Sequence, residues 1–177
     1  EDWRSRWKWT DAPDPSVEQR AEVWMARLSE GPENYDQREY LGRVLLDCTL
    51  GTALVWDDRV YVYAASAPSS GGGTEVFMTY SDDMTTWSDP VKVFDSPAGR
   101  IFNVAVTRDE QGMVFLWETD QRGRPFTMCM GRVEGPEDPW NPGIIDDAYY
   151  GRDKYTGGPA LYYENGWYYL LYLESLP

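Results

Sequence analysis

Histidine is absent from this 177-residue sequence, and cysteine occurs only twice. The lack of histidine excludes Ser-His-Asp and Cys-His catalysis and removes the commonest metal-binding side chain. Cys48 and Cys129 are too few and too far apart for a disulfide framework or a zinc site. Both stand beside apolar residues, so we expect buried free thiols. Any hydrolysis by this chain would have to rely on carboxylates.

Basic residues are scarce, and no long apolar run is present. The 16 Lys and Arg residues face 30 Asp and Glu residues, which gives a formal net charge of −14 and a pI near 4.3. Nucleic acids and anionic membrane surfaces require a basic footprint, so neither is expected as a partner. No segment approaches the length of a membrane span, and residues 1–4 do not resemble a signal peptide; if a signal existed, it has been removed.

Residues 14–31 carry the pattern of a short amphipathic helix. Asp14 or Ser16 can cap its start, and Gly31 followed by proline ends it. The apolar residues at helical spacing are Val17, Ala21, Trp24 and Leu28. This helix is assigned to an N-terminal extension spanning residues 1–46.

A pattern of strand, tight polar turn and strand then occurs three times, at residues 54–63, 106–115 and 161–170. The turn residues Arg59, Gly112 and Gly166 are 53 and 54 residues apart, a period that fits the four-stranded blade of a β-propeller. The nine Trp, thirteen Tyr and five Phe residues suit such packed sheets and also suit stacking against sugars. The predicted fold is therefore all-β.

The expected propeller domain spans residues 47–177 in about two and a half blades, near residues 47–99, 100–153 and 154–177, the last of them incomplete. Strands are predicted near 51–57, 60–66, 74–80, 90–94, 103–108, 113–119, 125–131, 143–146, 158–163 and 167–174. Such a fragment cannot close a ring, because propellers begin at about four blades. We expect a longer polypeptide or a second chain to supply the remainder.

Charged residues recur at equivalent positions of the repeat. Twelve residues before the three anchors lie Asp47, Arg100 and Lys154, and eight residues after the last two lie Asp120 and Glu174. The start of an innermost strand and the end of the antiparallel second strand share one face of a propeller, so these groups and Glu118 should gather at a central funnel. Carboxylates beside cations suit acid and base chemistry, although loops of an acidic protein are also charged by chance.

Two segments resemble five-bladed propeller glycosidases, the arabinanase/xylosidase and invertase-like families. Ser81, Asp83 and Trp87 match a Ser-x-Asp-x-x-x-Trp turn of their outer strands, in which the Asp bonds backbone N–H groups and the Trp packs between sheets. Gly158 and Pro159 match the Gly-Pro of a Glu-Gly-Pro blade start in the same families. The glycine and aromatic residues that follow this motif in those families are matched from residue 166 onward. The resemblance implies five blades in the complete protein and a secreted or periplasmic carbohydrate-active hydrolase.

The match covers about residues 47–177 but departs from the family at its catalytic positions. The catalytic Glu before Gly-Pro is Gly157 here, and the usual Asp of the second blade is Asn103. The Asp-Pro that opens the first blade has no direct counterpart, and Asp47 lies a few residues earlier. The chain is then either a hydrolase with relocated carboxylates or a propeller that binds glycans without cleaving them. A purely structural interaction module is a third alternative.

For the hydrolase, one carboxylate would activate water or attack the anomeric carbon while a second would protonate the leaving oxygen. Asp47 is the candidate base; Glu118 and Glu174 are candidate acids, because aromatic neighbours would favour their protonated forms. The candidate substrate-binding residues are Arg100, Asn103, Asp120, Lys154 and Tyr155. The expected ligand is an oligo- or polysaccharide. No cofactor is predicted; Ca2+ stays open because acidic loops suit it, although no loop has a recognisable calcium spacing.

Overall fold

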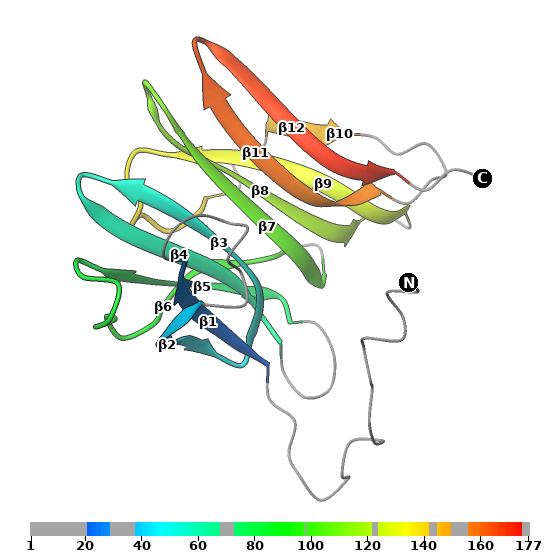
Figure 1. Cartoon of the computed structure of the whole chain (residues 1–177). Helices are drawn as coiled ribbons and strands as arrows, with labels where there is room; N and C mark the ends of the chain where they lie inside the picture. Colours follow the sequence, from blue (N-terminus) through cyan, green and yellow to red (C-terminus); the bar gives the residue numbers. More distant parts are fainter. Residues whose placement is uncertain are drawn as a thin grey trace, which may run out of the picture.

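The computed structural model describes residues 21–28, 38–67, 73–97, 99–121, 124–141, 145–149 and 156–174 (Figure 1). The regular elements in these ranges are β1 (Glu22–Arg27), β2 (Glu39–Leu46), β3 (Cys48–Trp56), β4 (Arg59–Ser66), β5 (Glu75–Ser81), β6 (Val91–Asp95), β7 (Ile101–Asp109), β8 (Gly112–Gln121), β9 (Arg124–Val133), β10 (Ile145–Tyr149), β11 (Thr156–Glu164) and β12 (Trp167–Glu174). Over this part of the chain the fold is all-β, and no helix there could span a membrane.

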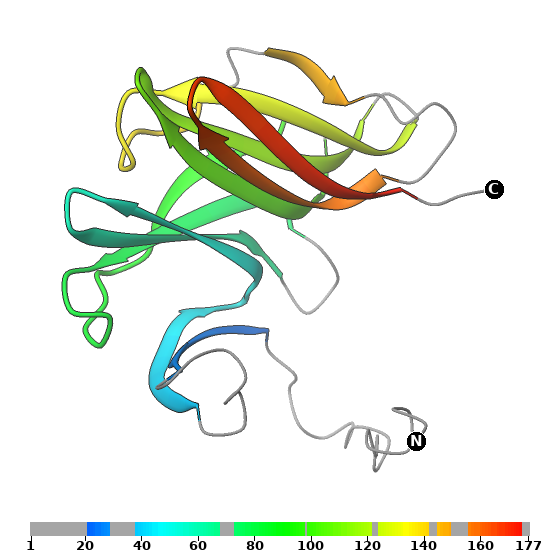
Figure 2. The ribbon, with the colours of Figure 1, turned by 45° about the horizontal axis from the view of Figure 1, so that its top comes forward.

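The strands form successive antiparallel sheets. β3 to β6 form one four-stranded sheet and β7 to β10 a second, here called blade 1 and blade 2. β11 and β12 form the two-stranded blade 3, and β1 pairs with β2. The first strands of the blades, β3, β7 and β11, lie side by side, and the sheets follow one another around them (Figure 2). This arrangement confirms the predicted partial β-propeller, and all the strands predicted in blades 1 to 3 are present.

Apolar side chains fill the spaces between neighbouring blades. Alternate residues of a strand face opposite sides of its sheet, so each blade can pack on both sides. The centre of the core between blades 1 and 2 is formed by Tyr63, Phe94, Phe115, Trp117 and Trp140. A smaller core between blades 2 and 3 is formed by Ala105, Val114, Leu116, Met128 and Leu161. The blades are thus joined face to face by burial of apolar area, the main driving force for folding.

The outer face of blade 3 is exposed in the part of the chain that the structure describes. Tyr169 on β12 is 52% exposed, whereas Tyr61 and Val114, at the equivalent register positions of blades 1 and 2, are 5% and 1% exposed. Trp167, next but one to Tyr169, is 70% exposed. In blades 1 and 2 this face is covered by the next blade along the chain. In blade 3 the corresponding face is exposed among the described residues.

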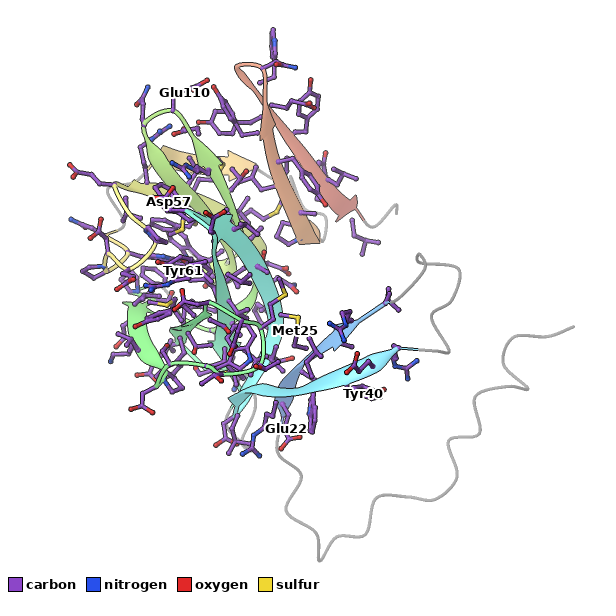
Figure 3. The ribbon with its side chains drawn as sticks, turned by 60° about the vertical axis from the view of Figure 1, so that its left-hand side comes forward. Glu22, Met25, Tyr40, Asp57, Tyr61 and Glu110 are labelled. Carbon is purple, nitrogen blue, oxygen red and sulfur yellow. The ribbon has the colours of Figure 1, made fainter. Side chains whose placement is uncertain are left out.

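The predicted N-terminal helix is wrong in its second half, because residues 22–27 form β1; residues 14–20 and 29–31 lie outside the described residues. Val23 and Met25 pack into a core that includes Leu45, while Trp24 is 53% exposed. Figure 3 shows Met25 on the side of the β1–β2 hairpin that faces blade 1. Alternation with period two fits these residues as well as helical spacing does, and pairing with β2 satisfies their backbone groups.

The hairpin turns between the first and second strands of the blades lie on one side of the molecule (Figure 1). Asp57 and Asp58 have φ values of 50° and 64°, and Gly112 and Gly166 have φ values of 143° and 81°. Asp tolerates this left-handed region and Gly favours it. The turns are local hairpin chemistry, in agreement with the sequence pattern.

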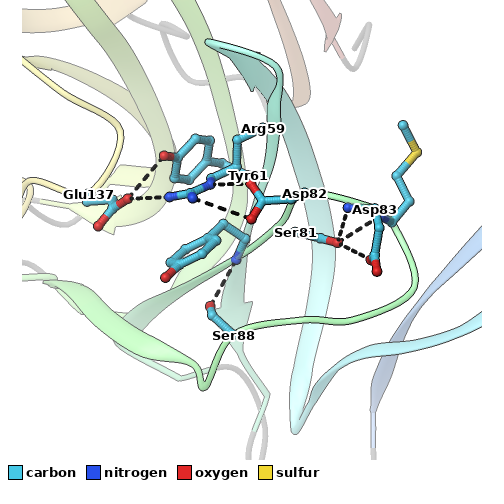
Figure 4. Close-up of polar contacts among 9 residues, drawn as sticks. Arg59, Tyr61, Ser81, Asp82, Asp83, Ser88 and Glu137 are labelled. Atoms are coloured by element: carbon cyan, nitrogen blue, oxygen red, sulfur yellow. Dashed lines mark hydrogen bonds and ion pairs between the residues drawn. The ribbon is translucent and has the colours of Figure 1, made fainter.

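The Ser-x-Asp-x-x-x-Trp segment forms the predicted structural turn after β5. Asp83 Oδ1 accepts hydrogen bonds from the backbone N–H groups of Thr86 (2.7 Å) and Thr85 (2.8 Å). These bonds lower the pKa of Asp83 well below its usual range. Ser81 Oγ also bonds Asp83 (Figure 4), and Trp87 packs against the core between blade 1 and the β1–β2 hairpin. The turn is closed by its own residues and is assigned a structural role.

Asp109 at the end of β7 links blade 2 to blade 3. Its carboxylate accepts hydrogen bonds from Arg132 Nη1 (2.7 Å), from the hydroxyl of Tyr168 on blade 3 and from the backbone N–H of Gln111 (2.8 Å). Burial pushes the pKa of Asp109 upward, but these hydrogen bonds outweigh it and leave the pKa below the ordinary value.

We therefore expect Asp109→Asn to lower the free energy of unfolding at pH 7 by about 1–3 kcal/mol, because a buried charge-assisted network is broken. A lowered folded-state pKa stabilises the protein above the unfolded pKa of about 4 and loses this effect as pH falls through the folded pKa. The difference in the free energy of unfolding between the wild type and Asp109→Asn should then shrink below pH 4. Urea denaturation at several pH values measures it, with the exposed turn variant Asp58→Asn as control; equal effects of the two substitutions would contradict the link.

Candidate functional site

The starts of the innermost strands and the ends of the second strands lie at one edge of the blades, here called the rim. The register pairs Cys48 with Ser66, Ile101 with Thr119 and Thr156 with Glu174. At the rim of blade 1, the Asp47 backbone N–H donates to the Ala21 carbonyl and the Asp47 carbonyl accepts from the Ala67 N–H, both at 2.7 Å. The predicted common edge is thus confirmed for the three blades.

A groove of about 590 Å³ runs along the three innermost strands. Its volume lies in the range of small-molecule sites. Its walls are formed by residues 51–55 of β3, by Asn103, Val104, Val106 and Thr107 of β7, and by residues 158–162 of β11. The groove is therefore built from the three blades together, at the place where a propeller has its central funnel.

Each innermost strand contains a β-bulge beside this groove. The register shifts between Thr49 and Thr52 in β3, between Ile101 and Val104 in β7, and between Gly157 and Ala160 in β11. A bulge adds one residue to a strand, re-aims a side chain and is common next to active sites. The bulged segments contribute Gly51, Asn103 and Gly158 to the wall of the groove. The same local device thus occurs at corresponding positions of the three blades, to within one residue.

The carboxylate of Glu118 lies where blades 2 and 3 meet at this groove. Glu118 Oε2 accepts a hydrogen bond from Asn103 Nδ2 and another, of 3.1 Å, from the backbone N–H of Gly158. Glu118 is fully buried, whereas Asn103 is half-buried and reaches the groove. A buried carboxylate is therefore held directly behind the groove wall by donors from both neighbouring innermost strands.

Strand alternation explains why Glu118 faces this junction. Leu116, two residues earlier on β8, packs into the core between blades 2 and 3, and Glu118 points to the same side. Trp117 belongs to the core between blades 1 and 2. Positive φ of 60° at Gly158 turns its N–H toward the carboxylate, a conformation that glycine adopts without strain.

The remaining predicted site residues are only partly placed. Asp47 is half-buried at the rim with φ of 56°, and Arg100 is exposed just before β7. Asp120 and Glu174 lie in the rim ends of β8 and β12, but their side chains are outside the described set, as are residues 154 and 155, the predicted Lys and Tyr. The structure thus brings together Glu118 and Asn103 from the predicted set. The sequence did not predict that Gly51 lines the groove or that the Gly158 N–H bonds Glu118. For Gly158, the Gly-Pro motif was the available signal.

Cys48, next to Asp47, is not a reactive group. Burial, with the charge of Asp47 adding to it, raises the pKa of the Cys48 thiol to about 11. The protonated thiol is a poor nucleophile at neutral pH. Cys48 and Cys129 are both buried, and neither forms a disulfide, as predicted.

A second hollow, of about 390 Å³, lies at the turn end of blade 1, far along the strands from the rim. Figure 4 shows Arg59 between Asp82 and Glu137, with Nε–Oδ1 at 2.8 Å and Nη1–Oε1 at 3.4 Å. The Tyr61 hydroxyl also donates to Glu137, at 3.1 Å. These contacts tie blade 1 to the loop that follows β9, so we assign them a structural role.

Metal-ligating side chains do not gather in groups of three or more within the described ranges. The site chemistry there rests on carboxylate, carboxamide and backbone groups. Calcium in the funnel stays an untested prediction.

Neither a protein-family model nor a curated protein sequence matches this chain. Among solved structures, the α-L-arabinanase of Penicillium chrysogenum, solved with arabinobiose, matches with a TM-score of 0.61 and 10% identity over 83% of this chain and 47% of that chain. Trypanosoma rangeli sialidase with sialic acid has a TM-score of 0.51 and 13% identity over 89% and 25% of the two chains. The β-1,2-mannobiose phosphorylase of Listeria innocua has a TM-score of 0.50 and 14% identity over 86% and 51%.

These similarities establish the fold. The chain has a β-propeller fold similar to that of these three proteins and spans about half the length of the arabinanase, at 47% of that chain. Identity of 10–14% carries no residue-level or substrate information. Function must be argued from the groove and the carboxylates near it.

Proposed function

We propose that this chain forms part of a secreted or periplasmic carbohydrate-active hydrolase whose glycan lies in the groove of β3, β7 and β11. The observation that carries the proposal is the position of the Glu118 carboxylate, bonded to Asn103 and to the Gly158 N–H at the junction of two innermost strands. These strands carry Asn103 and Gly157 where the resembling glycosidases carry carboxylates, so Glu118 supplies the missing acidic group from the neighbouring strand.

The proposed reaction uses two carboxylates. Asp47, at the rim before β3, activates water or attacks the anomeric carbon. Glu118 protonates the leaving oxygen, with Glu174 at the rim of β12 as the alternative acid. Because Glu118 is fully buried, this proton transfer needs the Asn103 segment of the groove wall to shift, so that the carboxyl group reaches the leaving oxygen directly or through one water.

The same burial favours a second candidate function, glycan binding without cleavage. In this second function, the fully buried Glu118 carboxylate, which accepts two hydrogen bonds, holds the Asn103 and Gly158 segments in place. In that case Gly157 marks the loss of the catalytic acid. The two functions share the groove and differ in turnover.

One experiment separates these functions. The full-length protein is incubated with arabinobiose and β-1,2-mannobiose, the sugars named for two of the similar proteins, and with a panel of plant and algal oligosaccharides. Calorimetry measures binding and chromatography measures release of shorter sugars. Binding with release is expected; binding without release favours the second function, and absence of any binding overturns both.

A further inference from the structure

Asn103 occupies two environments at once. Asn103 lines the groove, and its Nδ2 group donates to the buried Glu118 carboxylate behind the groove wall. The bulge between Ile101 and Val104 places it there. Asn103 is therefore the described residue that connects the groove with Glu118 through a side chain.

The chemistry of the carboxamide fixes its orientation. The Nδ2 group of Asn103 donates to Glu118 Oε2, and a carboxyl oxygen can accept this bond even when the other oxygen carries a proton, so the NH2 half of Asn103 faces Glu118. The Gly158 N–H bonds the same Oε2 atom at 3.1 Å and keeps the carboxylate in place. Because nitrogen and oxygen diverge from one carbon atom, an amide held by its nitrogen directs Oδ1 away from Glu118. Oδ1 is a strong acceptor with two lone pairs.

We propose that Asn103 determines the specificity of the groove by accepting, at Oδ1, a hydrogen bond from a hydroxyl group of the bound sugar unit. The inference rests on the proposed glycan-binding function and adds the feature of the sugar that is recognised. The other polar side chains of the groove wall belong to Thr52, Thr107 and Tyr162, whose hydroxyl groups rotate and can donate or accept. Among the side chains that the structure describes in this wall, that of Asn103 is the one held by a buried carboxylate, so it imposes the requirement for a donor at one position.

A site built to bond a sugar hydroxyl disfavours the analogue that lacks it, because its own polar group is then left unpaired. The test uses whichever of arabinobiose and β-1,2-mannobiose binds the full-length protein more tightly, with its complete set of monodeoxy analogues. The wild type should bind one analogue about tenfold to a hundredfold more weakly than the parent sugar. Asn103→Ala should bind the parent and that analogue within about twofold of each other. Asn165→Gly, in the exposed β11–β12 turn, is the matched control that keeps the wild-type preference.

The outcomes are distinct. If Asn103→Ala weakens binding of the parent sugar and of every analogue by one common factor, Asn103 is a structural residue. If Asn103→Ala leaves every affinity at its wild-type value, another group recognises the hydroxyl. Either result overturns the inference while the proposed function stands. If neither sugar binds the wild type, both the inference and its basis fail. Should Asn103→Ala not fold, Asn103→Ser replaces it, because serine fills part of the volume without reaching the sugar.

Discussion

Glu118→Gln should reduce glycan hydrolysis by the full-length protein about 10²- to 10⁴-fold, the range associated with loss of a general acid or base. Glutamine keeps the size of the side chain and an oxygen that can accept from Asn103 or Gly158, but it cannot transfer a proton. Glu118 lies behind the groove wall rather than in it, so the affinity for the glycan should change by no more than about threefold. The expected signature is a loss of kcat at nearly constant KM.

The matched control is Glu164→Gln at the turn end of β11, an exposed glutamate at the opposite end of the blade from the rim. Its kcat and KM should equal those of the wild type. Thermal unfolding of Glu118→Gln must stay close to that of the wild type for the kinetic result to count. A folded Glu118→Gln protein with wild-type turnover would show that Glu118 is a scaffold group and that the reacting acid lies elsewhere on the rim.

Phe115→Ala should lower the free energy of unfolding by about 3–5 kcal/mol, the usual cost of emptying a large buried aromatic site. Phe115 is fully buried, and its ring lies 4.3 Å from that of Trp140 at 12° between the planes. It also packs directly on Gly131, where an added Cβ would come within 2.3 Å of the ring. Neighbouring rings are large and fixed, so the cavity can collapse only partly.

Urea and thermal denaturation measure this effect, with an expected fall in Tm of about 6–20 °C. Val91→Ala on β6, where the side chain is 51% exposed, is the control and should change stability by less than about 0.5 kcal/mol. A loss below about 1 kcal/mol for Phe115→Ala would mean that the packing between blades 1 and 2 contributes little, against the propeller arrangement described above.

The blades could be predicted from sequence because their determinants are local. Asp57 with Asp58, Gly112 and Gly166 mark turns that require positive φ, and the flanking apolar residues fix which strands pair. Equal spacing of these turns then implied equivalent sheets. The helix prediction failed because the residues around Trp24 fit both periods, and the partner that decides between them, β2, lies some twenty residues later.

The site could be predicted only in part, since it depends on contacts between blades. Sequence reasoning placed Glu118 and Asn103 on one face of the ring, but their direct contact depends on the bulge in β7, for which residues 101–104 carry no local signal. In β3 and β11 the glycines at 51 and 158 are compatible with a bulge without requiring one. Register irregularities of this kind are settled by packing of the whole sheet.

The three equivalent bulges have a consequence for how this scaffold can change. Each one absorbs its extra residue locally, so the hydrogen-bond ladder beyond it is unaffected by which side chain stands there. Gly51 and Asn103, on the bulges of two blades, are then adjustable positions around a single hollow, whereas the φ of 60° at Gly158 favours glycine there. Duplicated units can diverge at these positions while the framework stays intact, and a small combinatorial library at the same positions is the natural starting point for engineering new ligand preferences.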